Sequence, residues 1–216
     1  MTTEAITTEP MPVQPRPASS PRQPAPAEPQ TPHPSTTAPR KTGPMTTMTP
    51  QQPAPAPVYC THLDAPVGRL LLTADADGAL TSLSVPGQKG GRIVQEDWRY
   101  DPGPFRAAAE QLAAYFAGDL KEFRLPLRAT GTAFRQRVWA ALDEVPYGAT
   151  VTYGEIAARI GAPRAAVRAV GGAIGANPLL ILRPCHRVIG ANGSMTGYAG
   201  GLERKVRLLT LEGALP

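Results

Sequence analysis

The stretch that decides the fold is residues 152–178, TYGEIAARIGAPRAAVRAVGGAIGANP. Thr152 and Glu155 are spaced as a capping box, in which each side chain accepts a hydrogen bond from a backbone amide at a helix start. Gly161 ends that helix, and Pro163 suits the first position of a second helix, which the closing Asn-Pro pair terminates. Two short helices joined by a glycine turn predict a helix-turn-helix.

The second of these helices consists almost entirely of Ala, Val and Gly, with Arg164 and Arg168 projecting from it. Such a helix lets its backbone approach a surface closely while two cations reach phosphates or a groove. Net charge is +5 over residues 129–216, −1 over residues 58–128 and +1 over residues 1–57. Because phosphate contacts dominate nucleic-acid affinity, this localised basicity favours a polyanionic partner.

The segment before the helix-turn-helix region has a different pattern. Alternating apolar residues predict strands over 58–63, 68–74 and 80–85, separated by turn signals. Helical spacing of apolar residues follows from Pro104 to a capping Gly118. We expect an α/β domain here, made of a small antiparallel sheet with a covering helix.

The first 57 residues contain 16 of the 26 prolines and no apolar runs. Such a composition buries too little apolar surface to offset the entropy of ordering, so we expect a disordered tail. Met45 and Met48 are alternative translation starts, which would shorten this tail. No secretory signal and no apolar run of about 18 residues occurs, which predicts a soluble, cytoplasmic protein. The expected parts are therefore a tail (1–57), an α/β domain (58–128) and a mainly α domain (129–216).

The candidate reactive residue is Cys185, which follows a predicted apolar strand over 179–182 and precedes His186 and Arg187. Positive charge and hydrogen-bond donors lower a cysteine pKa, so this context predicts a nucleophilic thiolate. The alternative is a buried structural cysteine, which is also our interpretation of Cys60. Two cysteines are too few for a disulfide framework and lack the paired spacing of a zinc site.

Four motifs occur in one order: RAVGG at 168–172, NP at 177–178, PCHRVIG at 184–190 and TGYAGG at 196–201. Together they resemble the O6-alkylguanine-DNA alkyltransferase family, in its stand-alone bacterial form. The resemblance covers residues 58 to about 215. It implies a ribonuclease-H-like domain, a winged helix-turn-helix domain and transfer of an alkyl group from O6 of guanine in double-stranded DNA to the protein, once per molecule. It also implies a monomer without cofactor or metal, and leaves the range of alkyl groups and O4-alkylthymine open.

The resemblance also implies roles for individual residues. Cys185 corresponds to the alkyl acceptor, and His186 to the general base that acts through a water molecule. Glu212 corresponds to the carboxylate that orients the imidazole, and Asn177 to the residue that braces the site. A positioned base with its own orienting group is the usual arrangement around an activated nucleophile.

The same resemblance places a second group of residues against DNA. Tyr153 and Arg168 correspond to the pair that extrudes the damaged nucleotide, because a base is dealkylated only outside the stack. Residues 190–201 correspond to the loop that forms one wall of the guanine pocket. The remaining positions expected at DNA or at the flipped base are Arg135, Gly154, Arg187, Tyr198 and Ala199.

Two positions depart from the family pattern. Val167 is an extra residue between Pro163 and Arg168; we expect the helix start to absorb it, and the alternative is that it swings Arg164 toward DNA. Arg183 replaces the usual aliphatic residue before Pro-Cys, and there it must either face solvent or perturb the thiol.

Three other classes of protein share part of the pattern. A lesion-binding alkyltransferase-like protein would lack the acceptor Cys185. A winged-helix transcription regulator would have no use for the PCHR motif or the glycine loop, and a Cys/His hydrolase would have no use for a recognition helix. No S-adenosylmethionine signature is visible, so the alkylated DNA is the expected donor.

Overall fold

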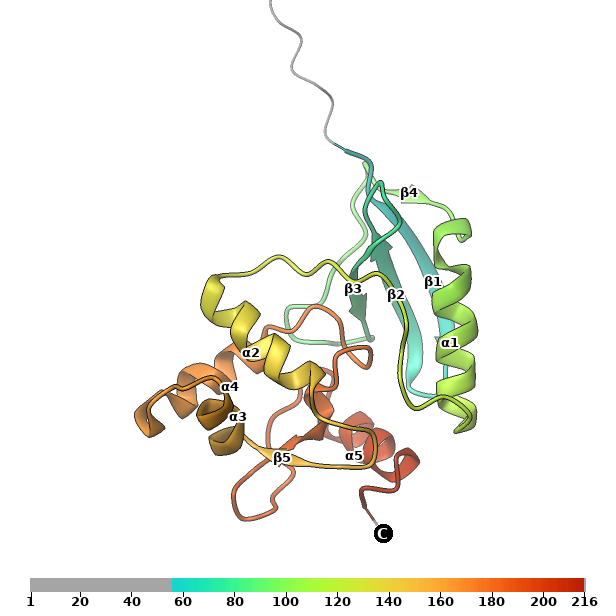
Figure 1. Cartoon of the computed structure of the whole chain (residues 1–216). Coiled ribbons are helices and arrows are strands. Elements are labelled where there is room, and N and C mark those ends of the chain that lie inside the picture. Colours follow the sequence, from blue (N-terminus) through green and yellow to red (C-terminus); the bar gives the residue numbers. More distant parts are fainter. Residues whose placement is uncertain (1–55, 216) are drawn as a thin grey trace, which may run out of the picture. The chain divides into compact units, whose positions relative to one another are not determined.

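The structure is a computed structural model that describes residues 56–215 (Figure 1). Nearly all of the tail that the sequence predicts to be disordered therefore lies outside the described residues. Within the described range, no helix is long and apolar enough to cross a membrane.

The first half of the described range forms a four-stranded sheet. Its strands are β1 (Tyr59–Ala65), β2 (Gly68–Ala74), β3 (Leu80–Ser84) and β4 (Arg99–Tyr100), in the order β3-β2-β1-β4. The first three form the predicted antiparallel meander, and the short β4 adds parallel to β1. A two-residue turn joins β1 to β2, and Gly68 has φ +110°, a conformation that favours glycine.

Helix α1 (Arg106–Ala117) lies against this sheet, as the sequence predicts (Figure 1). A short 3-10 turn (Gly103–Phe105) leads into it, and the left-handed Gly118 closes its last turn. The helix buries Ala108, Leu112 and Tyr115, which are spaced three and four residues apart and therefore lie on one face.

The second half is mainly helical. Its elements are α2 (Ala133–Asp143), β5 (Val151–Thr152), α3 (Tyr153–Arg159), α4 (Val167–Gly175), β6 (Val188–Ile189) and α5 (Leu202–Leu211). Thr132 caps α2, and the predicted capping box at the start of α3 is present. Helices α3 and α4 are the expected helix-turn-helix, with Gly161 at φ +65° between them.

The start of the second helix of this pair differs from the prediction. Pro163 is the residue before a 3-10 turn (Arg164–Ala166), and α4 begins only at Val167. The residue that is extra relative to the family pattern therefore falls where the tight turn changes into an α-helix. A 3-10 turn has fewer residues per turn than an α-helix, so the rotation of side chains around the helix axis changes at this point.

The predicted strand over 179–182 is wrong. These residues form a fully buried turn, with Ile181 at φ 70° and a single bridge from Leu179 to Leu83 of β3. A short apolar run reports burial but does not distinguish a strand from a buried turn.

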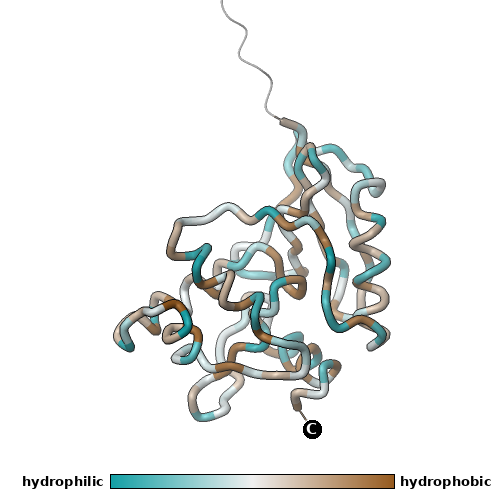
Figure 2. Tube along the Cα trace, in the orientation of Figure 1, coloured by the Kyte–Doolittle hydropathy of each residue, from teal (hydrophilic) through white to brown (hydrophobic). Residues whose placement is uncertain are grey.

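One hydrophobic core joins the two halves. Leu83 and Leu112 belong to the same buried cluster as Val138, Leu142 and Leu179. Figure 2 shows apolar segments alternating with polar ones along α1, as expected for a helix with one buried face. The turn that carries the PCHR motif is therefore anchored to the sheet as well as to the helices.

Candidate active site

Cys185 begins the 3-10 turn η3 (Cys185–Arg187), and only 3% of its surface is exposed. Asn177 donates a hydrogen bond from Nδ2 to its Sγ at 3.2 Å. Nδ2 also lies 3.1 Å from the carbonyl oxygen of Arg183, and Oδ1 accepts from the amide of Leu179 at 3.0 Å. Asn177 therefore fixes both the sulfur and the turn that carries it, which agrees with its expected bracing position.

The sequence-based prediction of a thiol with a lowered pKa is wrong. Burial raises the pKa of Cys185 to about 11, although Asn177, Lys205 and Arg183 act to lower it. Charged neighbours in the sequence do not guarantee charged neighbours in space, because successive residues of a 3-10 turn point about 120° apart. At neutral pH the resting group is a thiol, and its proton must leave during the reaction.

His186 and Glu212 meet as expected, with Nε2 2.8 Å from Oε1 and both side chains fully buried. The same carboxylate accepts two hydrogen bonds from Arg187, at 2.8 and 2.9 Å, and one from the Tyr115 hydroxyl at 2.7 Å. Tyr115 belongs to α1, so the N-terminal half supports the site directly. Its place on the apolar face of its helix is the one signal in the sequence that could have indicated this tyrosine.

The charges of this cluster determine the tautomer of the imidazole. Burial raises the pKa of Glu212, but hydrogen bonds from His186 and Arg187 outweigh it and lower the pKa to about 2. Burial lowers the pKa of His186 and outweighs the opposite effect of Glu212. An ionised Glu212 can only accept, so Nε2 of a neutral His186 carries the proton. Its Nδ1 is then a free base, and it has no hydrogen-bond partner among the described residues.

The structure places Arg187 away from the DNA contact expected from the sequence. Its side chain is buried, with Nε and Nη2 on Glu212 and Nη1 donating to the carbonyl oxygen of Val145 at 2.5 Å. Its hydrogen bonds therefore all go to protein groups. In this geometry Arg187 keeps Glu212 charged and fixes its orientation.

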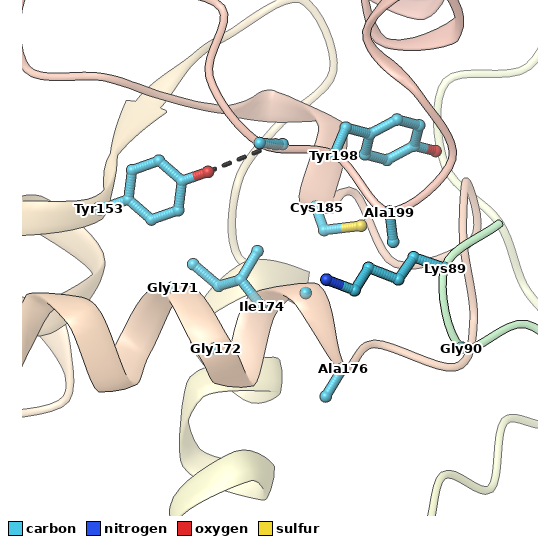
Figure 3. Close-up of a pocket in the computed structure, with 12 residues that line it drawn as sticks. Lys89, Gly90, Tyr153, Gly171, Gly172, Ile174, Ala176, Cys185, Tyr198 and Ala199 are labelled. Atoms are coloured by element: carbon cyan, nitrogen blue, oxygen red, sulfur yellow. Dashed lines mark hydrogen bonds between the residues drawn. The ribbon is translucent and has the colours of Figure 1, made fainter.

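A pocket of about 480 Å³ has Cys185 in its lining (Figure 3). The glycine loop forms one wall through Tyr198 and Ala199, as the resemblance implies, and α4 forms another. The complete lining is Lys89, Gly90, Tyr153, Gly171, Gly172, Ile174, Gly175, Ala176, Cys185, Gly197, Tyr198 and Ala199. Sequence reasoning missed Lys89 and Gly90, which belong to the loop between β3 and β4.

Two side chains hold the glycine loop over this pocket. Tyr153, on α3, donates its hydroxyl to the carbonyl oxygen of Thr196 at 3.1 Å. Lys205, on α5, is fully buried and donates to the carbonyl oxygens of Val188 at 2.5 Å and Thr196 at 2.9 Å. Burial lowers the pKa of Lys205 to about 8. A lysine at a buried position of an amphipathic helix is the sequence signal that could have identified it.

The expected DNA-contacting residues outside the pocket are exposed. Arg135 on α2, Gly154 at the start of α3 and Arg168 on α4 all lie on the surface. Within residues 56–215, neither Arg135 nor Arg168 forms an ion pair. Their charges are therefore available to a ligand.

Arg183 does not face solvent. It forms a bidentate ion pair with Asp143 of α2, at 2.8 and 3.0 Å, and its guanidinium lies 5.4 Å from the centre of the Trp139 ring. The sequence left open whether Arg183 faces solvent or perturbs the thiol. The second alternative is observed, because the guanidinium is buried and its charge acts to lower the pKa of Cys185.

No group of three or more His, Cys, Asp or Glu residues that could hold a metal ion occurs in the described part of the chain.

Comparisons with known proteins identify the family of this chain. Residues 58–129 match the model of the 6-O-methylguanine DNA methyltransferase ribonuclease-like domain, and residues 133–214 match the model of the DNA-binding domain of the same enzyme. The methylated-DNA--protein-cysteine methyltransferase of Mycolicibacterium paratuberculosis is 53% identical over 150 residues, which are 69% of this chain and 89% of that protein. The protein of the same name from Methanosarcina acetivorans is 49% identical and covers 73% and 99%. The crystal structure of Mycobacterium tuberculosis OGT in complex with DNA superimposes with a TM-score of 0.67 at 51% identity, covering 72% of this chain and 93% of that one.

Proposed function

The chain belongs to the 6-O-methylguanine DNA methyltransferase family, and we propose that it repairs DNA by moving the alkyl group of O6-alkylguanine onto Sγ of Cys185. The observation that carries the assignment of the acceptor is the position of this cysteine. Its sulfur lies at the pocket between α4 and the glycine loop, and the next residue in the chain, His186, is a neutral imidazole that a carboxylate holds in one tautomer.

The resting state of the thiol sets the order of the chemistry. With a pKa raised to about 11, Cys185 is protonated at neutral pH, so proton removal accompanies attack on the alkyl carbon. Nδ1 of His186 takes the proton, directly or through a water molecule, and Glu212 stabilises the resulting positive charge. The S–C bond forms, the C–O6 bond breaks, and its electron pair stays on the guanine, which takes up a proton. The products are a thioether and unmodified guanine.

We assign recognition to the exposed face of the helix-turn-helix. Arg168 projects from a helix of small residues, and Tyr153 lines the pocket together with that helix. A small-residue helix suits close approach to the minor groove, and the guanine has to leave the stack to reach the sulfur. We assign the exposed Arg135 and Gly154 to contacts with the DNA backbone. Alkylated guanine in duplex DNA is thus the substrate. We propose a cytoplasmic protein, because its substrate is DNA.

The proposed division of the chain follows these roles. Residues 58–128 form a supporting domain that contributes Tyr115 to the site, and residues 129–216 form the alkyltransferase domain. We propose that one molecule acts alone, because every residue assigned to the transfer step comes from this one chain.

The test is a titration of duplex DNA that contains O6-methylguanine, followed by intact-protein mass spectrometry. Product should reach a plateau equal to the amount of active protein, because a thioether has no low-barrier route back to a thiol in water. The methyl adduct should map to Cys185. Cys185→Ala should abolish transfer and retain DNA binding, whereas the matched change Cys60→Ser should leave the plateau unchanged. Product that continues past the protein concentration would support the hydrolase alternative instead.

A further inference from the structure

The loop between β3 and β4 brings a charged side chain to the substrate pocket. Lys89 lines the pocket across from Tyr153, and Figure 3 shows its ammonium end extended toward Ile174 of α4. Among the twelve lining residues of this pocket, Lys89 is the only one that is charged at neutral pH. Burial raises the pKa values of Cys185, Tyr153 and Tyr198, so these groups stay neutral.

Hydrogen bonds fix the loop that carries this lysine. The amide of Lys89 donates to the carbonyl oxygen of Ala199 at 3.2 Å, which ties this loop to the glycine loop that forms one wall of the pocket. The side chain of Gln88 accepts from the amide of Val85 at 3.1 Å, and Ser84 accepts from the amide of Arg92 at 3.2 Å. Lys89 is therefore held at the pocket by its backbone, while no described residue forms an ion pair with its ammonium group.

We propose that Lys89 makes the pocket select alkyl adducts that carry a negative charge, of which a carboxymethyl group on O6 is the smallest. The inference rests on the proposed function, since it concerns the group transferred to Cys185. The remainder of the lining consists of apolar, glycine and tyrosine residues, which can accommodate an alkyl chain but offer no countercharge. An ammonium group with no protein partner favours a carboxylate placed within hydrogen-bond reach.

The transfer step is the same as for a methyl group. Sγ of Cys185 bonds to the methylene carbon, the bond from that carbon to O6 breaks, and its electron pair stays on the guanine. The thiol proton passes to His186 and the guanine takes up a proton. The product is an S-carboxymethyl cysteine whose carboxylate remains beside Lys89.

The experiment compares three duplexes that differ only in the O6 adduct: carboxymethyl, its uncharged carbamoylmethyl analogue and methyl. Single-turnover rates are measured with protein in excess. Lys89 is exposed in the free protein. In Lys89→Met, the ratio of the carboxymethyl rate to the carbamoylmethyl rate should fall about twofold to fivefold, the size expected for one exposed charge pair. Lys89→Arg should retain the ratio, and so should Arg92→Met, which removes a charge from the same loop outside the pocket lining.

Two outcomes would overturn the proposal. An unchanged ratio in Lys89→Met would show that the charge does not reach the adduct. An equal loss of rate on all three duplexes would show that Lys89 serves a DNA phosphate. Either result would leave the proposed function intact as long as the wild-type protein transfers methyl groups, whereas failure of methyl transfer in the wild-type protein would count against the proposed function itself.

Discussion

The buried cluster around Glu212 and the exposed face around Arg168 differ in how completely their polar groups are paired. In the buried cluster, Glu212 accepts hydrogen bonds from Tyr115, His186 and Arg187. On the exposed face, the guanidinium of Arg168 has no ion-pair partner within residues 56–215. The protein therefore fixes the groups that move a proton before DNA arrives and leaves the groups that bind DNA without partners.

This difference has a physical cause. An unpaired charge in a dry interior is costly, so the charges beside the sulfur must be satisfied by the protein itself. An exposed arginine is hydrated in the free protein and exchanges water and counterions for phosphates on binding. Substitutions in the two regions should consequently have different effects. Those in the buried cluster should lower the transfer rate and the stability of the fold, whereas those on the exposed face should impair DNA binding and base flipping.

The largest effect is expected for Glu212→Gln. The change leaves Arg187 buried without a carboxylate, which should lower the free energy of unfolding by about 3 kcal/mol, measured by urea denaturation. It also removes the carboxylate that holds the His186 imidazole in one tautomer and stabilises its positive charge, so the transfer rate should fall about 100-fold. The final plateau should stay equal to the protein concentration, because Cys185 is intact. Glu203→Gln, at the exposed start of α5, the helix that Glu212 directly follows, is the matched control and should alter neither quantity.

Acid should reveal the same carboxylate in the wild-type protein. The folded-state pKa of Glu212 is about 2, below the ordinary value of about 4.3 for a glutamate. Its stabilisation is therefore fully present above about pH 4.3 and is lost as the pH falls through about 2. If the Glu212→Gln variant lost stability over this range as steeply as the wild-type protein, the assigned pairing would be contradicted.

A smaller, different effect is expected for Arg168→Ala. One lost cation among many should weaken DNA binding little at moderate salt, while the extrahelical base loses the side chain that fills its place. The single-turnover rate at saturating DNA should fall about tenfold. A rate equal to that of the wild-type protein would remove Arg168 from this role. If Arg164→Ala were the more damaging change, the extra Val167 would have shifted the register of the helix.

The smallest effect is expected for removal of residues 1–57, of which only the last two lie within the described range. The tail contributes a net charge of only +1 and has no pattern that could form a core. The transfer rate and the yield of folded protein should equal those of the full chain. A large loss of the transfer rate or of the folded protein would show that the tail packs on the domain. The tail would then be a third functional region beside the buried cluster and the exposed face.

Local signals in the sequence were sufficient for most of the fold. The capping box at Thr152, the left-handed Gly118 after α1 and the alternation along β1 to β3 act over a few residues, so their outcome does not depend on the rest of the chain. The turn over 179–182 was not predictable in this way, because its residues are apolar whether they pair as a strand or fold back in the core.

The sequence by itself, through its family resemblance, named Cys185, His186, Asn177 and Glu212 as the reactive centre, and in the structure Asn177 contacts Cys185 and Glu212 contacts His186. Only the tertiary structure decided their charges. Burial raises the pKa of the thiol, lowers that of the imidazole and assigns Arg187 to Glu212 rather than to DNA. Motif spacing records which groups are brought together, whereas the ionisation of each group depends on how much water remains around it, and that is set by packing from elements far away in the sequence.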